Sequence, residues 1–143
     1  MPAESRPILL EKNGIKVREE LMVKCDTHEE ALEITKEIMS LSEPPDAIFA
    51  VNDLTAIGAL KVLRQLNVRV PENVSVIGFT DGLVATVTDP PLTTVSQHGF
   101  EIGKKATEML LRRINALEED YPASTEIIPT ELIIRGTTRP LPK

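Results

Sequence analysis

The chain has 143 residues, a formal net charge of −6 and a pI near 5.0. This length fits one globular domain and is too short for two full domains with a cleft between them. The acidic balance provides no basic face for nucleic acid. The single cysteine, Cys25, excludes an internal disulfide, and with only His28 and His98 beside it we expect no structural metal site.

Nothing in the sequence indicates a membrane or a secretory route. The longest unbroken apolar run, residues 47–51, is far shorter than a membrane span. The first seven residues lack the apolar core of a signal peptide. We therefore expect a cytoplasmic protein.

The first part of the chain reads as a helix end, a strand and a helix. Residues 8–13 resemble the last turns of a helix that stops at Gly14. The apolar run 21–25 has the length of a strand. Asp26 or Thr27 can cap the helix that follows, which ends before Pro44 and Pro45. Its apolar stripe consists of Ala31, Ile34, Ile38 and Leu41.

The middle of the chain alternates buried strands with a helix. The stretch 46–51 is apolar at consecutive positions after Asp46, which predicts a strand buried on both faces, as in a parallel sheet covered by helices. Asn52 and Asp53 open a helix over 54–66, and a second buried strand follows at 74–79. This order predicts the α/β class, with a doubly wound parallel sheet connected by right-handed crossovers.

The last part of the chain is less regular. Residues 80–91 carry turn signals, and 92–97 form a candidate strand or extended crossover. An amphipathic helix is predicted over 100–117, and 130–135 alternate in the manner of a strand near the sheet edge. The apolar stripe of the helix comprises Ile102, Ala106, Met109, Leu110, Ile114 and Leu117.

Three polar clusters are expected beyond the carboxyl ends of the strands, where open α/β sheets bind ligands. They are Asn52–Asp53, Thr80–Asp81–Gly82 and Gln97. Their amides and carboxylates suit a polyhydroxylated ligand. Taken singly, residues of these types at such places are more often helix caps or turns, and the occurrence of all three clusters at one sheet edge favours a ligand site only in part. No nucleophile, base and oxyanion hole assemble, so we predict no catalytic residue, no cofactor and no metal.

Four segments in a fixed order carry a more specific signal than the chemistry does: Pro45–Asp53 with Ala56–Leu60, Val70–Phe79, Pro91–Gln97 and Glu131–Thr138. Together they resemble the LacI-type (lactose/galactose repressor) transcriptional regulators. The similarity extends over about residues 8–139, and periplasmic sugar-binding proteins share the implied fold.

The resemblance implies that residues 1–143 are part of an effector-binding and dimerisation domain with a periplasmic-binding-protein-like fold. About 8–97 and 126–139 would form its carboxyl-terminal lobe, and 98–125 would be the helix that crosses to the other lobe. The other lobe, the first strand of this lobe and the DNA-reading helix-turn-helix of the family are not found in the sequence. Operator DNA would be a partner only through that helix-turn-helix.

The resemblance also implies site residues. Asn52, Thr80, Asp81 and Gln97 fall where the family lines its ligand cleft, although Thr80 departs from the acidic or Asn residue common there. The implied ligand is a small sugar or sugar derivative. A homodimer interface maps to Ile57, Leu60, Lys61 and Val84. Ordinary packing against the sheet explains Ile57 about as well as an interface does.

Two other functions stay open at this point. A fragment of a periplasmic solute-binding protein would require a secretion signal and a monomer, and a small α/β enzyme would use Asp81 as its acidic residue. The resemblance also implies that part of the normal partner of the helix over 100–117 belongs to the other lobe, so this helix should pack on its own sheet, exchange with a second chain, or be poorly ordered.

Overall fold

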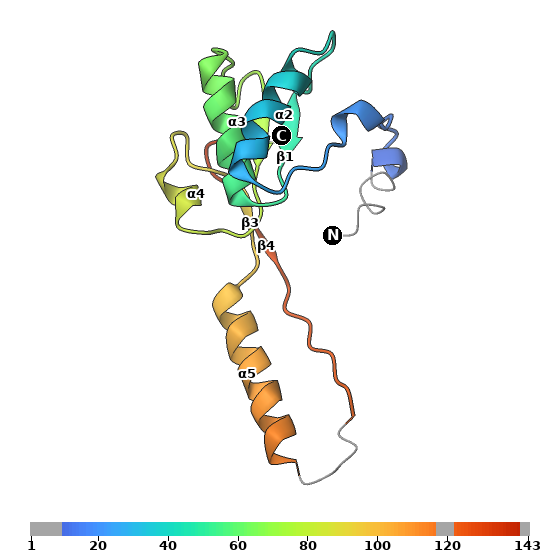
Figure 1. Ribbon diagram of the computed structural model, residues 1–143, viewed down its shortest axis with the longest axis vertical. Coiled ribbons are helices and arrows are strands. Elements are labelled where there is room, and N and C mark those ends of the chain that lie inside the picture. Colours follow the sequence, from blue (N-terminus) through green and yellow to red (C-terminus); the bar gives the residue numbers. More distant parts are fainter. Residues whose placement is uncertain (1–9, 117–121, 141–143) are drawn as a thin grey trace.

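The computed structural model describes residues 10–116 and 122–140. A body carries the short strands and three of the helices, and a long arm projects from one side of it (Figure 1). The arm consists of helix α5 (Gly99–Asn115) and of an extended stretch that returns along it into strand β4 (Glu131–Ile133).

The first described residues confirm a helix end before Gly14. Residues 10–12 are helical, and Gly14 has φ +70°. The N–H of Ile15 donates to the carbonyl of Leu10 at 2.9 Å, and the N–H of Gly14 donates to that of Glu11 at 3.0 Å. This is the left-handed helix stop that favours glycine. Ile8 and Leu9 lie outside the described residues.

The strand predicted over 21–25 is wrong. The 3₁₀ turn η1 (Glu19–Leu21) leads into a stretch that forms no strand. A strand exists only where a neighbour accepts and donates its ladder hydrogen bonds. No described strand lies alongside these residues, so their apolar character alone does not produce one.

Helix α2 (His28–Met39) begins at a capping box formed by Thr27 and Glu30. The hydroxyl of Thr27 accepts from the N–H of Glu30, and the Glu30 carboxylate accepts from the N–H of Thr27 and, at 2.8 Å, from that of Asp26. These backbone hydrogen bonds hold the pKa of Glu30 below its ordinary value of 4.5. The cap is therefore Thr27, one of the two residues predicted.

Helix α3 (Asp53–Gln65) packs against α2 through a close approach at Gly58. A Cβ at Gly58 would lie 2.7 Å from the Cβ of Ala31 and 2.8 Å from the carbonyl oxygen of His28. The two helices therefore lie side by side, as Figure 1 shows. The α3 side chains Ala56 and Leu63 enter a core with Val74, Val76 and Leu92.

The strands are shorter than predicted but keep the expected order. β1 (Ala47–Phe49) and β2 (Ser75–Ile77) are parallel, with Ile48 opposite Val76. β3 (Thr94–Ser96) continues the sheet through parallel bridges from Ile77 to Thr93 and from Thr80 to Ser96. β4 is antiparallel to β3 and mostly exposed, which confirms a strand near the edge. The fold is an α/β lobe with a parallel sheet.

The expectation that β1 is buried on both faces is wrong. Ala47 and Phe49 are exposed and Ile48 is only half-buried. In the described chain β1 has β2 on one edge and no strand on the other. A continuous apolar run is the pattern of a central strand, whereas the structure places it at an edge.

The carboxyl-terminal residues join β2 to β3. The buried Thr137 donates from its hydroxyl to the carbonyl of Val76 at 2.7 Å and accepts from the N–H of Thr93 at 2.8 Å. Gly136 lies against Pro90 and Pro91, where a Cβ would come within 2.8 Å. Residues far apart in the sequence thus complete one sheet.

Helices α4 and α5 differ from the sequence prediction, α4 because it lies in a predicted loop and α5 because its apolar stripe is not buried. Within the predicted loop 80–91, Val84–Val87 form the short helix α4. Helix α5 has no buried residue, and Phe100, Leu110, Leu111 and Ile114 are exposed on it. It therefore does not pack on its own sheet, and Leu117 lies outside the described residues. No helix in the described ranges is both long and apolar enough to cross a membrane.

Candidate ligand-binding site

The carboxyl ends of β2 and β3 bring two of the predicted site residues together. Thr80 follows β2, and its N–H donates to the carbonyl of Val95 in β3 at 2.9 Å. The side-chain amide of Gln97, just past β3, lies 3.4 Å from the hydroxyl of Thr80, at the long limit of a hydrogen bond. Thr80 and Gln97 therefore share one small polar surface at the sheet edge.

Asn52 lies at the start of α3 and acts as its cap. Its Oδ1 accepts from the N–H of Thr55 at 2.9 Å and from the Thr55 hydroxyl at 2.8 Å. Its Nδ2 donates to the carbonyl of Asp26 at 3.2 Å. The capping interpretation is thus confirmed for Asn52, and its side chain also ties the start of α3 to the residues before α2.

Asp53 joins three elements and was not singled out as a site residue of its own. Its side chain is buried, with the residue only 3% exposed. Oδ1 accepts from the hydroxyl of Thr94 in β3 at 2.6 Å, and Oδ2 accepts from the N–H of Gly82 at 2.8 Å. One carboxylate therefore fixes α3, β3 and the loop after β2 relative to one another.

The carboxylate of Asp81 forms an ion pair with Arg135. A guanidinium nitrogen of Arg135 lies 2.7 Å from its carboxylate, and the other donates to the carbonyl of Leu92 at 2.9 Å. Both side chains are mostly buried. Arg135 thus holds the loop at 80–82 onto the sheet, a role that the sequence analysis did not assign.

The loop at this edge has an unusual backbone. Thr80 has φ +140° and Asp81 has φ +61°, and neither is a glycine. Non-glycine residues in such conformations cost about 1–3 kcal/mol each and persist only when their surroundings hold them. The hydrogen bonds of Thr80 to Val95 and of Asp81 to Arg135 provide that support. Strain of this kind is typical of functional loops.

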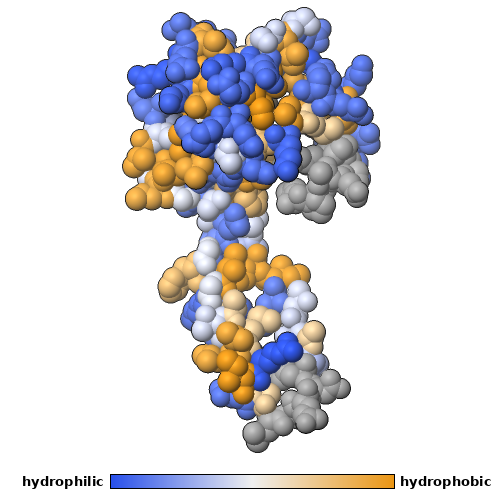
Figure 2. Space-filling view, viewed as in Figure 1, coloured by the Kyte–Doolittle hydropathy of each residue, from blue (hydrophilic) through white to orange (hydrophobic). Residues whose placement is uncertain are grey.

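The predicted interface residues lie on α3 and α4. Ile57 and Leu60 are half-buried, Lys61 is exposed, and Val84 is half-buried at the start of α4. More exposed apolar side chains stand beside them: Leu83 is 82% exposed and Val87 is 73% exposed. Figure 2 shows the apolar surface over α4. Leu83 and Val87 are not among the predicted interface residues, because the turn signals of residues 80–91 predict a loop where the structure has helix α4.

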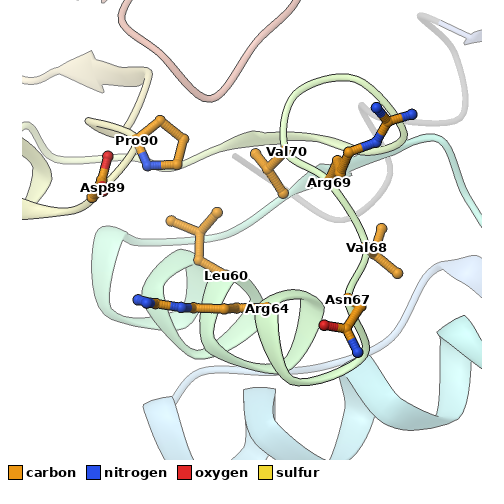
Figure 3. Close-up of a pocket in the computed structure, with 8 residues that line it drawn as sticks. All are labelled: Leu60, Arg64, Asn67, Val68, Arg69, Val70, Asp89 and Pro90. Carbon is orange, nitrogen blue, oxygen red and sulfur yellow. The ribbon is translucent and has the colours of Figure 1, made fainter.

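A separate cavity lies at the other end of α3. It has about 440 Å³ and is lined by Leu60, Arg64, Asn67–Val70, Asp89 and Pro90, none of them a predicted ligand residue (Figure 3). The guanidinium groups of Arg64 and Arg69 point in different directions (Figure 3). A single anion in this cavity would therefore not be held by both arginines.

In the described part of the chain, no group of three or more His, Cys, Asp or Glu side chains is placed to hold a metal ion. The polar edge instead offers a hydroxyl and an amide at Thr80 and Gln97, supported by the hydrogen bonds that Asp53 accepts and by the ion pair of Asp81 with Arg135. Neutral donors and acceptors of this kind bind hydroxyl-rich ligands by hydrogen bonding.

Comparison with known proteins assigns the fold to a family. The sequence model of the periplasmic binding protein-like domain matches residues 8–138. The chain therefore belongs to the periplasmic binding protein-like domain family, which agrees with its parallel sheet and with the polar edge beyond β2 and β3.

Within this family, the chain is similar to LacI-type regulators, as its sequence motifs indicate. It is 35% identical over 134 residues to the HTH-type transcriptional repressor CytR of Escherichia coli, covering 93% of this chain and 39% of CytR. The chain thus spans well under half of that relative. By its name this relative is a transcriptional repressor.

Solved structures give the same assignment. The complex of the transcriptional regulator CelR with cellobiose superposes with a TM-score of 0.84 at 31% identity, covering 92% of this chain and 40% of CelR. A LacI family regulator of Lactobacillus casei with bound sucrose superposes with a TM-score of 0.81 at 26% identity, covering 94% of this chain and 50% of the regulator.

Proposed function

We propose that this chain is the effector-sensing and dimerisation part of a LacI-type transcriptional regulator of carbohydrate metabolism. The observation that carries the proposal is the polar edge formed by Thr80 and Gln97 on a lobe of this family. The sugar-bound regulators that superpose on the chain support a sugar-like ligand.

The ligand contacts divide between two kinds of residue. Thr80 and Gln97 present a hydroxyl and an amide that touch only each other weakly, so they are available to sugar hydroxyls. Asn52 and Asp81 are engaged with Thr55 and Arg135, and they contribute by shaping the edge or through their remaining hydrogen-bonding capacity. An exposed edge of this size makes few contacts, so we expect affinity for the isolated chain to be weaker than micromolar.

The test is a titration with cellobiose, followed by the side-chain amide signals of Gln97 and Asn52 in nuclear magnetic resonance spectra. We expect saturable shifts of both signals in the millimolar range, and Gln97→Ala should weaken binding at least threefold. Gln65→Ala, an exposed glutamine at the end of α3, is the matched control and should change nothing. If tens of millimolar of cellobiose and sucrose leave both signals unmoved, the sugar assignment is refuted.

The apolar surface of α3 and α4 supports a homodimer. Ile57, Leu60, Lys61 and Val84 lie on this surface, and Leu83 and Val87 provide its most exposed apolar side chains. An exposed cluster of this kind is typical of an interface between subunits. We propose that a second copy covers it through a two-fold axis, so that the same patch meets itself.

Sedimentation equilibrium tests the dimer. The unmodified chain should form dimers in the micromolar range, and Leu83→Lys should raise the dissociation constant at least tenfold. Leu66→Lys is the control, because Leu66 is an exposed leucine at the C-cap of α3 and is not one of the proposed interface residues. A chain that remains monomeric at 200 micromolar, or equal weakening by both variants, contradicts this interface.

The regulatory step that we propose, closure of two lobes around a ligand, takes place in a full-length regulator that contains both lobes. A ligand held between two lobes stabilises the closed state by its differential affinity, and closure shifts the two DNA-reading heads of the dimer. Residues 98–125 connect the lobes in this scheme, while 8–97 and 126–139 form the lobe itself. The chain alone, acidic and without reading helices in its sequence, should not bind operator DNA.

A further inference from the structure

Two exposed charges of opposite sign lie beside the apolar surface of α3 and α4. Arg64 is on α3, four residues beyond Leu60, and positions four apart lie on the same face of a helix. Asp89 follows the last residue of α4 by two positions. Both residues are exposed, and both line the cavity of about 440 Å³ at the end of α3. The surface proposed as a dimer interface therefore extends into a cavity that carries both charges.

Neither of these charges has an ionic partner within its own chain. In residues 10–116 and 122–140, no ion pair involves Arg64 or Asp89. Arg69, the other cation of the cavity, differs because its Nε lies 3.4 Å from Oδ1 of Asn73. Its guanidinium group also points away from that of Arg64 (Figure 3). Arg64 and Asp89 are thus available to pair with groups of another molecule.

The cavity between the two charges has an apolar lining. Leu60, Val68, Val70 and Pro90 contribute to it, and all four are half-buried. In Figure 3, Leu60 lies between the side chain of Arg64 and Pro90. An ion pair that forms across such a lining is screened less by water than a pair on an open surface. Pairing at this place therefore contributes more to association than an ordinary surface ion pair does.

A two-fold axis limits how this surface can meet itself. Contacts across such an axis are reciprocal, so that any contact from one copy to the other occurs twice. If α3 faced α3 of the second copy, the cations Lys61 and Arg64 of both copies would lie together and repel one another. If α3 faces the chain after α4 of the second copy, each Arg64 meets an Asp89. The charges favour the second arrangement.

We propose that Arg64 of each copy forms an ion pair with Asp89 of the other, and that these reciprocal pairs select a second copy of this chain as the partner. The inference rests on the proposed dimer and adds the residues that decide which chain is accepted. A related chain without one of these charges would leave an Arg64 or an Asp89 unpaired at the interface, which lowers its affinity relative to that of a true copy.

Reversal of either charge tests the pairing. Arg64→Glu and Asp89→Arg each place like charges opposite one another twice in a dimer, and each should raise the dissociation constant in sedimentation equilibrium at least tenfold. Asp89→Arg is the more informative variant. It changes the net charge of the chain from −6 to −4 and so reduces the general repulsion between two copies. A weaker dimer then has a local cause.

Combining the two reversals should restore association. The double variant Arg64→Glu/Asp89→Arg keeps an opposite charge at each contact, so its dissociation constant should lie within threefold of that of the unmodified chain. An equimolar mixture of the two single variants should form heterodimers, which native mass spectrometry resolves by mass. In such a heterodimer the two substituted positions face each other, and the unchanged Arg64 of one chain faces the unchanged Asp89 of the other.

Arg69→Glu is the matched control. It changes the net charge by as much as Arg64→Glu does and lies in the same cavity, but Arg69 points in another direction (Figure 3). It should change the dissociation constant less than twofold. Circular dichroism spectra of all these variants should coincide with that of the unmodified chain, because the three substituted residues are exposed.

The proposal is overturned if either single reversal leaves dimerisation unchanged, if the double variant stays as weak as the single ones, or if Arg69→Glu weakens the dimer as much as Arg64→Glu. Dimers that respond to Leu83→Lys but not to the charge reversals refute the ion pairs and leave the proposed dimer standing. A chain that remains monomeric at 200 micromolar refutes both.

Discussion

Removal of the Asp53 carboxylate tests whether this buried group holds the polar edge together. Asp53→Ala leaves the hydroxyl of Thr94 and the N–H of Gly82 without the acceptors that now lie 2.6 and 2.8 Å away. Hydrogen bonds to a charged group contribute about 1.5–3 kcal/mol each, and their loss is not fully additive. We therefore expect Asp53→Ala to lower the free energy of unfolding by about 3–5 kcal/mol.

Urea denaturation followed by circular dichroism measures this change. Asp53→Asn keeps one acceptor and should cost about half as much, so it serves if Asp53→Ala does not fold. A double-mutant cycle with Thr94→Val should give a coupling energy of about 1.5–3 kcal/mol. The control is Asp46→Ala, an exposed aspartate whose removal should change stability by less than about 0.5 kcal/mol. A cost below about 1 kcal/mol for Asp53→Ala, or no coupling to Thr94, refutes the reasoning.

Three further predictions concern single positions. Gly58→Ala should destabilise the chain by about 1–3 kcal/mol in urea, because the new Cβ meets Ala31 and a carbonyl, whereas Gly103→Ala in α5 meets nothing within 4 Å and should be neutral or stabilising. Thr80→Gly should stabilise the chain by up to about 1 kcal/mol in thermal unfolding, since glycine tolerates φ +140°. The lowered pKa of Glu30 means that its contribution is present above pH 4.5 and is lost as the pH falls below that value. Glu30→Gln should therefore flatten the acid limb of a stability-against-pH curve, and an unchanged limb would contradict the capping box.

The helices and the parallel order could be predicted because their signals are local. Thr27 and Asn52 each precede their helix and meet an N–H three residues on. Gly14 marks a helix end by its own backbone. Such contacts lie within one turn of chain, so the sequence window contains both partners.

The burial of β1 and the state of residues 21–25 could not be predicted in the same way. A strand requires a neighbour, and the identity of that neighbour is not encoded in the strand itself. The run 47–51 predicts a central position, yet the structure gives it one paired edge and a groove on the other. The same argument applies to α5, whose apolar stripe predicts a partner that the lobe does not supply.

At the site, the sequence located the edge but not the contacts that build it. Thr80 and Gln97 were found from the rule that ligands bind beyond the carboxyl ends of parallel strands. The tying roles of Asp53, which was named only as part of a polar cluster, and of Arg135 were missed because their partners lie 29, 41 and 54 residues away in the sequence. No spacing in the sequence identifies such a pair.

Substitutions at the polar edge are expected to fall into two classes: those that reduce both stability and ligand binding, and those that reduce ligand binding alone. Asp53 and Arg135 hold the loop and the sheet together, so their loss should reduce stability and ligand binding in parallel. Gln97 makes one long hydrogen bond to Thr80 and supports no other described element, so its loss should reduce binding while leaving the free energy of unfolding nearly unchanged. Under the proposed function, ligand preference is therefore expected to change at Thr80 and Gln97 without disturbing the fold, because Asp53 and Arg135 hold the fold together and Thr80 and Gln97 do not.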